Sequence, residues 1–139
     1  MQRVMAFDVG ERRIGVAVCD PLGITAQGLE TYTRTDSEAA DIEHLLNLAK
    51  QYQPVKLVFG MPRNMNGSYG MQAEYTKAFA DKLLENWQGE YDFYDERLTT
   101  AGAKRILLEA DVSRGKRKQV IDKIAAVIIL EDYLSAHGC

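Results

Sequence analysis

The chain has 139 residues, of which 46% are hydrophobic and 27% charged, and its formal net charge is −3. This length predicts a single domain over residues 1–139 with one hydrophobic core. No apolar run approaches the roughly 20 residues that cross a bilayer, and the first apolar run is too short for a signal peptide, so we expect a cytoplasmic protein without a membrane partner. Two cysteines, Cys19 and Cys139, indicate neither a disulfide framework nor a zinc site.

Positive charge is concentrated towards the C-terminus. Residues 104–123 contain seven basic and three acidic side chains, a net charge of +4, so the remainder of the chain carries −7. Such asymmetry is typical of a local phosphate-binding face, although a solvent-exposed first turn of a helix explains it equally well.

The first part of the chain reads as three strands. Apolar runs over residues 4–8 and 14–19 are each followed by turn residues, and a third strand is predicted through residues 29–32. Because short connections join the three strands, they are expected to form an antiparallel meander.

The remainder alternates helices and strands. Asp36 or Ser37 is expected to cap the first helix, in which apolar residues recur at helical spacing until Pro54. The segments that follow are a strand over 55–60, a loop over 61–70, a helix over 71–87, a strand over 91–94, a helix from 99 or 100 to about 109, and a largely buried helix over about 119–137.

This order predicts an α/β fold, with one five-stranded mixed sheet and helices on both faces. Right-handed crossovers place the fourth strand beside the first and the fifth beside the fourth, which gives the strand order 3-2-1-4-5. The carboxyl ends of the first, fourth and fifth strands then lie side by side, at an edge where open sheets often bind ligands.

Acidic residues are expected to meet at that edge. Asp8 ends the first strand, Asp95 and Glu96 follow the fifth, and Asp122 lies among apolar residues at the start of the last helix. Carboxylates that converge without His or Cys suit Mg²⁺ or Mn²⁺. Two such ions roughly 3.5–4 Å apart promote hydrolysis of a phosphodiester.

Each carboxylate also has a plainer explanation. Asp8 can cap the following turn, residues 95–97 can form a surface ion pair, and Asp122 can interact with its helix dipole or with Lys118. The predicted topology favours the metal-site interpretation because it sends all three to one edge.

Four motifs, in this order, resemble the YqgF family, small bacterial proteins also called RuvX, over essentially the whole chain. The motifs are Asp8-Val9-Gly10-Glu11-Arg12-Arg13-Ile14-Gly15-Val16-Ala17, Gly60-Met61-Pro62-Arg63-Asn64-Met65-Asn66-Gly67, Asp95-Glu96-Arg97-Leu98-Thr99-Thr100, and Lys116-Arg117-Lys118 ahead of Asp122 with Ala125-Ala126 and Ile129-Leu130.

The resemblance implies a ribonuclease H-like fold and a nuclease, a hydrolase acting on ester bonds, with Asp8, Glu96 and Asp122 as its catalytic and metal-binding triad. It also implies maturation of the 5′ end of pre-16S ribosomal RNA in ribosome biogenesis. The family was first assigned as Holliday-junction resolvases by similarity to RuvC. Glu11 departs from the family, which often has Thr there, and Asp95 is either an outer ligand or a partner of Arg97.

Polar and basic residues are candidates for contacts with a nucleic acid. Basic side chains would make salt-sensitive phosphate contacts, and asparagines of the 61–70 loop would read a 2′-hydroxyl. The candidates are Arg12, Asn64, Asn66, Arg97, Arg114, Lys116, Arg117 and Lys118. We expect precursor rRNA rather than branched DNA as the nucleic-acid partner, with ribosomal particles as a further partner. We expect the protein to be either a monomer or a homodimer.

Three other functions compete with this one. A Holliday-junction resolvase would need a dimer to cut two strands. A non-catalytic RNA-binding ribosome-assembly factor would need no acidic triad. A kinase-like ATPase shares the Asp-x-Gly hairpin but needs a second related domain, for which this sequence has no second hairpin of that kind.

Overall fold

The computed structural model describes residues 3–10, 12–20, 25–61, 71–95 and 125–135. The elements in chain order are β1 (Val4–Val9), β2 (Arg13–Cys19), β3 (Ala26–Thr33), α1 (Glu38–Tyr52), β4 (Lys56–Met61), α2 (Met71–Leu84) and β5 (Glu90–Asp95), and residues 125–135 are also helical. The five strands form one sheet in the order β3-β2-β1-β4-β5, as predicted.

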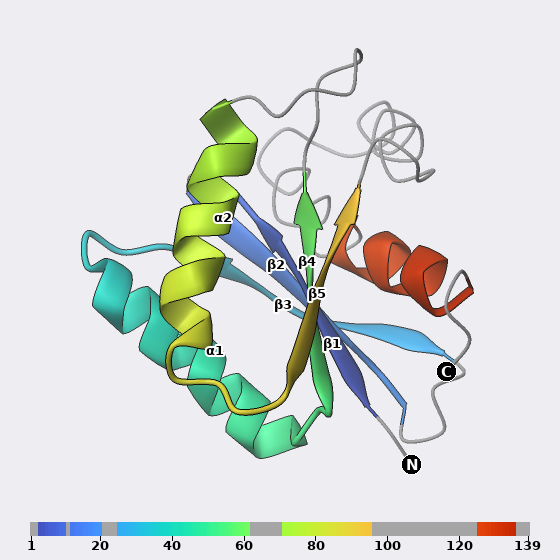
Figure 1. Ribbon diagram of the computed structural model, residues 1–139. Helices are drawn as coiled ribbons and strands as arrows, with labels where there is room; N and C mark the ends of the chain where they lie inside the picture. The colour runs from blue at the N-terminus through green and yellow to red at the C-terminus, as the bar shows by residue number, and fades with distance from the viewer. Residues whose placement is uncertain (1–2, 11, 21–24, 62–70, 96–124, 136–139) are drawn as a thin grey trace.

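The sheet is mixed in the predicted way. β1 pairs antiparallel with β2, and β2 pairs antiparallel with β3. β1 pairs parallel with β4, and β4 pairs parallel with β5. In Figure 1 the arrowheads of β4 and β5 accordingly point the same way, and α1 and α2 lie on the opposite side of the sheet from the helix at residues 125–135.

Alternation along the central strand builds a core on each face. Met5, Phe7 and Val9 of β1 join a buried cluster with residues of α1 and α2, whereas Val4 and Ala6 join a second cluster with the 125–135 helix. Complete burial of a side chain such as Phe7 contributes about 1.5–3 kcal/mol. Helices therefore cover both faces of the sheet, as the sequence predicts.

The first helix begins as expected. Ser37, one of the two predicted caps, accepts a hydrogen bond from the backbone N–H of Ala40 at 3.2 Å. Gln53, which caps the C-terminus of the helix after Tyr52, adopts a left-handed backbone conformation with φ of 51°. Glycine usually occupies this position because its missing Cβ removes the steric cost.

Two predicted boundaries were wrong by three residues. β3 starts at Ala26 rather than Leu29, because pairing with β2 extends the strand through a register shift. α2 ends at Leu84 rather than Trp87, and the N–H of Trp87 donates to the carbonyl of Leu84 in a tighter turn at 3.1 Å. Trp87 still packs against the core cluster, so its apolar spacing reflected burial and not helical structure.

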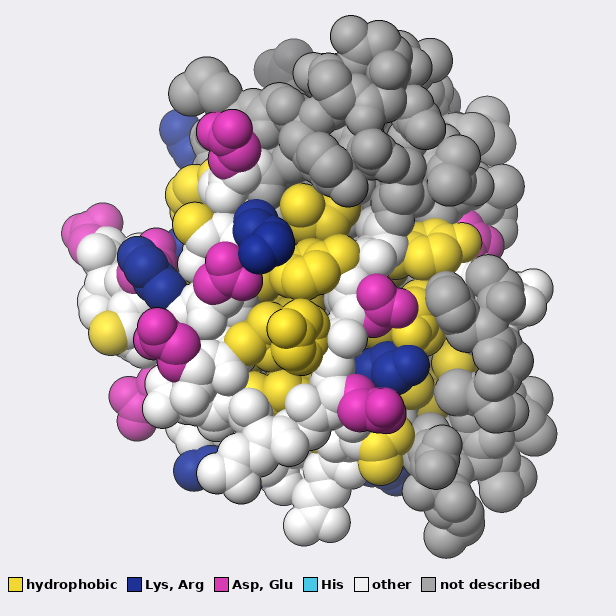
Figure 2. Space-filling view, viewed as in Figure 1, with side chains coloured by type: hydrophobic (Ala, Val, Ile, Leu, Met, Phe, Trp, Pro, Cys, Tyr) yellow, Lys and Arg dark blue, Asp and Glu magenta, His cyan; other side chains and the backbone are white. Residues whose placement is uncertain are grey.

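β5 is an edge strand of the described sheet, and its outer edge is partly protected from pairing with another strand. Figure 2 shows hydrophobic side chains grouped in the middle of this view, flanked by charged ones. Tyr91 is 54% exposed, and the Lys77 ammonium lies 5.5 Å from the ring centre of Phe93. The Asp92 carboxylate accepts a hydrogen bond from the N–H of Phe93 at 2.8 Å, which occupies a donor that another strand would need.

Candidate functional site

The carboxyl ends of three parallel strands define the candidate site. The register aligns Phe7 of β1 with Phe59 of β4 and Phe59 with Phe93 of β5, and the rings of this row lie 5.3 and 5.6 Å apart. Because the aligned strands run the same way, they end at one edge of the sheet. Val9, Met61 and Asp95 are the last residues of these strands.

Asp8 lies one residue before the end of β1 and is half-buried. It is paired with Gly15 of β2, so strand pairing holds its backbone in place. Strand alternation puts Asp8 on the same face as Val4 and Ala6, which is the face covered by the 125–135 helix. The structure therefore places this predicted ligand at the expected edge.

A tight turn follows Asp8. The N–H of Gly10 donates to the carbonyl of Arg13 at 2.9 Å, and Arg12 between them is exposed. A Cβ atom on Gly10 would lie only 2.8 Å from the carbonyl oxygen of Arg13, so the turn requires glycine there. Arg12 is thus presented to solvent from the loop that leaves the candidate site.

The other two members of the predicted triad lie outside the described residues. Glu96 comes directly after Asp95, the last residue of β5, and Asp122 precedes Ala125 by three residues. Glu96 thus follows, in sequence, a strand that ends at the same sheet edge as Asp8. Asp122 is close in sequence to the helix that covers the Asp8 face. Within the described residues, no group of three metal-binding side chains comes together.

Seven of the eight predicted substrate contacts also lie outside the described residues, and only Arg12 can be placed. The seven are Asn64, Asn66, Arg97, Arg114, Lys116, Arg117 and Lys118.

A partly buried polar cluster joins the helix on the Asp8 face to the sheet. Tyr133 donates its hydroxyl to Asp92 of β5 at 2.9 Å and accepts from the Lys56 ammonium of β4 at 2.9 Å. The Tyr133 hydroxyl raises the pKa of Lys56, and burial raises the pKa of Tyr133. These contacts fix the helix at residues 125–135 against β4 and β5.

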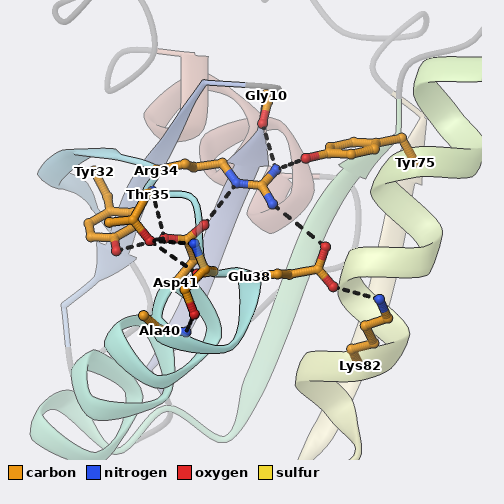
Figure 3. A network of polar contacts seen from close by, with 10 residues as sticks. Gly10, Tyr32, Arg34, Thr35, Glu38, Ala40, Asp41, Tyr75 and Lys82 are labelled. Carbon is orange, nitrogen blue, oxygen red and sulfur yellow. Dashed lines mark hydrogen bonds and ion pairs between the residues drawn. The ribbon is translucent and has the colours of Figure 1, made fainter.

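A second polar network, which the sequence analysis missed, lies beside the turn after Asp8 (Figure 3). Asp41 of α1 is fully buried and accepts hydrogen bonds from the Tyr32 hydroxyl at 2.8 Å, the Thr35 N–H at 2.9 Å and the Arg34 Nε at 3.3 Å. Burial alone would raise the pKa of Asp41, but hydrogen bonds from Thr35, Tyr32 and Arg34 outweigh it and hold the pKa below its ordinary value. The signal for Asp41 was its spacing, because it lies four residues before Leu45 on the buried stripe of α1.

No helix in the described part of the chain is long and apolar enough to cross a membrane.

Comparison with solved structures identifies the class of fold. The structure of Thermus thermophilus RuvC in complex with a Holliday junction substrate matches with a TM-score of 0.61 at 9% identity, over 99% of this chain and 97% of that one. A second T. thermophilus RuvC structure matches with a TM-score of 0.57 at 10% identity, over the same shares of the two chains. The chain therefore has the ribonuclease H-like fold. A family model described as "RuvX: Holliday junction resolvase" matches residues 2–136, and the chain belongs to this family.

Relatives match over nearly the whole chain. The protein from Moorella thermoacetica is 53% identical over 98% of this chain and 96% of its own length, and that from Enterococcus faecalis is 52% identical over 98% and 99%. The protein from Halalkalibacterium halodurans is 51% identical over 95% of each. Each of the three is named "Putative pre-16S rRNA nuclease".

Proposed function

We propose that this chain is a divalent-metal-dependent nuclease, a hydrolase of phosphodiester bonds, and that residues 1–139 form one nuclease domain. The observation that carries the proposal is the place of Asp8. It is a half-buried carboxylate at the edge where β1, β4 and β5 end, and it faces the side covered by the 125–135 helix. Membership of the RuvX family supports the same class of activity.

Asp8, Glu96 and Asp122 are the proposed catalytic and metal-binding residues. Three carboxylates offer the oxygen ligands that Mg²⁺ and Mn²⁺ prefer. When bound, such ions would supply Lewis acidity for phosphodiester hydrolysis, and we propose two of them. The spacing along the chain supports the grouping, because Glu96 follows β5 directly and Asp122 lies three residues before Ala125, the first described residue of the helix on the Asp8 face.

Arg12 is the proposed phosphate contact within the described residues. Its exposed side chain leaves the turn that follows Asp8, so a nucleic acid bound at the strand ends would pass within its reach. Asn64, Asn66, Arg97, Arg114, Lys116, Arg117 and Lys118 are proposed to extend this contact surface. Phosphate contacts of this kind weaken as the salt concentration rises.

Precursor 16S ribosomal RNA is the proposed substrate, and the names of relatives that are 51–53% identical support it. Processing of this RNA would place the protein in the cytoplasm, in contact with ribosomal particles. A four-way DNA junction is the second candidate, because the matching family model is described as a Holliday junction resolvase.

One cleavage experiment tests the class of activity and the substrate together. Purified protein is incubated with labelled precursor 16S RNA or a labelled four-way DNA junction, in Mg²⁺, Mn²⁺ or EDTA. We expect cleavage of the RNA at its 5′ side in either metal, and none in EDTA or with Asp122→Asn. Cleavage that persists in EDTA would contradict the metal site, and cleavage of the junction alone would reassign the substrate to DNA.

A further inference from the structure

We propose that Arg34 is a positioning residue, which fixes the turn between β1 and β2 and thereby presents Arg12 to the substrate. The part that concerns substrate rests on the proposed function, whereas the part that concerns the turn does not. Arg34 follows β3 by one residue and is far from Arg12 in the chain, but its backbone and its guanidinium both contact this turn.

Two hydrogen bonds join Arg34 to the turn. Its backbone N–H donates to the carbonyl of Arg12 at 2.8 Å, and its Nη1 donates to the carbonyl of Gly10 at 3.1 Å. The same turn is closed internally by the N–H of Gly10, which donates to the carbonyl of Arg13. Arg34 therefore holds the carbonyls of Gly10 and Arg12, on either side of position 11, at the point where the chain leaves the sheet.

The guanidinium is itself held in one orientation by groups from both helices (Figure 3). Its Nε donates to the buried Asp41 carboxylate of α1 at 3.3 Å, and Nη1 also donates to the hydroxyl of Tyr75 of α2. The Glu38 carboxylate lies 3.9 Å from Nη2, and the Phe79 ring centre lies 4.6 Å from the guanidinium carbon. Because the planar guanidinium is fixed by both helices, its hydrogen bond to Gly10 holds the turn in place relative to α1 and α2.

Arg34 is poorly suited to bind phosphate itself. Its side chain is 7% exposed, and its charge faces the carboxylates of Asp41 and Glu38. Arg12, by contrast, is exposed. The contribution of Arg34 to substrate binding therefore acts through Arg12.

The effect should be limited to the turn. Asp8 is paired with Gly15, and the next pair, Val9 with Ile14, closes the ladder before the turn begins. Loosening of the turn should therefore displace Arg12 and leave the backbone of Asp8 in place. In kinetic terms, loss of the Arg34 fork should raise KM for the nucleic acid and change kcat little.

Amide hydrogen exchange measured by NMR tests the structural part without reference to activity. Arg34→Lys keeps the positive charge beside Asp41 but removes the planar fork, and Tyr75→Phe is a milder second variant. In Arg34→Lys we expect the amides of Gly10 and of position 34 to exchange about tenfold faster, while the amide of Phe7 in β1 is unchanged. Arg3→Lys, the same replacement one residue before β1, should change neither. Unchanged exchange at Gly10 in both Arg34→Lys and Tyr75→Phe would overturn the proposal.

Kinetics on labelled precursor RNA with Mg²⁺ test the link to Arg12. Arg34→Lys should raise KM about threefold to tenfold, with kcat within about twofold of wild type. In an Arg12→Ala background the same replacement should raise KM no further, because its effect passes through Arg12. Multiplicative effects of the two replacements would overturn the proposal. If the wild-type protein cleaves no nucleic acid, the proposed function fails, and the exchange experiment alone decides the role of Arg34.

Discussion

Replacement of Asp41 by Asn should destabilise the protein by about 2–3 kcal/mol at pH 7. Both carboxylate oxygens of Asp41 are used. Oδ1 accepts from Tyr32 and Thr35, and Oδ2 accepts from Arg34 at 3.3 Å. An asparagine can keep only one oxygen, so its amide would face the Arg34 Nε with donor against donor. The estimate corresponds to one lost hydrogen bond between charged groups.

Urea denaturation followed by circular dichroism measures this change. With an m value of about 1–3 kcal/mol/M for a protein of this size, the midpoint should fall by about 1 M or more. Asp81→Asn is the matched control, because Asp81 is 55% exposed and pairs with Lys77 one helical turn away, a contact worth about 0.5 kcal/mol or less.

The cost of Asp41→Asn should also depend on pH. Because the folded protein holds the pKa of Asp41 below its ordinary value of 3.8, the ionised carboxylate stabilises the fold fully above that value. This contribution disappears as the pH falls through the lower pKa of the folded state. The difference between wild type and Asp41→Asn should therefore shrink from pH 7 to pH 3. A destabilisation below about 1 kcal/mol at pH 7, or one that is constant over this range, would refute the reasoning.

Three further replacements probe the backbone and the core. Gln53→Gly should stabilise the protein by about 1 kcal/mol because it relieves the left-handed backbone at φ of 51°, whereas Gln51→Gly within α1 should cost about as much; equal urea midpoints for the two would contradict this. Thr76→Val should raise the melting temperature, since the buried Thr76 hydroxyl has no hydrogen-bond partner among the described residues, and a lower value would show that the hydroxyl is satisfied. Gly10→Ala should cost about 1–3 kcal/mol because its Cβ would lie 2.8 Å from the Arg13 carbonyl oxygen, and an unchanged denaturation midpoint would mean that the turn adapts.

The arrangement of the sheet could be predicted because it depends on local patterns and general rules of connection. Two apolar runs end at Asp8 and Gly60, and a two-strand continuation of the meander and a helix with an apolar stripe lie between them. This pattern predicts a parallel crossover. Boundaries were less accurate where tertiary pairing decides them, as at Ala26, where β3 begins before its apolar run.

The candidate site could be predicted only in part. Asp8 has a local signal, a carboxylate at the end of an apolar strand, and its predicted place is confirmed. Glu96 and Asp122 stay predictions. Arg34 carries no such signal, because its role depends on three contacts from segments far apart in the sequence, namely Gly10, Asp41 and Tyr75. Convergence of this kind is a property of the folded chain and leaves no periodic pattern.

The central claim is that Asp8 serves a metal-dependent phosphodiesterase site, and the most direct test compares two replacements of Asp by Asn. Asp8→Asn alters the proposed metal ligand. Asp20→Asn makes the same change directly after the last residue of β2, away from the candidate site. There Asp20 accepts a hydrogen bond from the N–H of Thr25 at 3.1 Å. The measurement is the initial rate of cleavage of labelled precursor 16S RNA at saturating Mg²⁺. We predict that Asp8→Asn lowers this rate about a hundredfold or more with an unchanged circular dichroism spectrum, and that Asp20→Asn stays within about twofold of wild type. Equal rates for Asp8→Asn and wild type would contradict the claim.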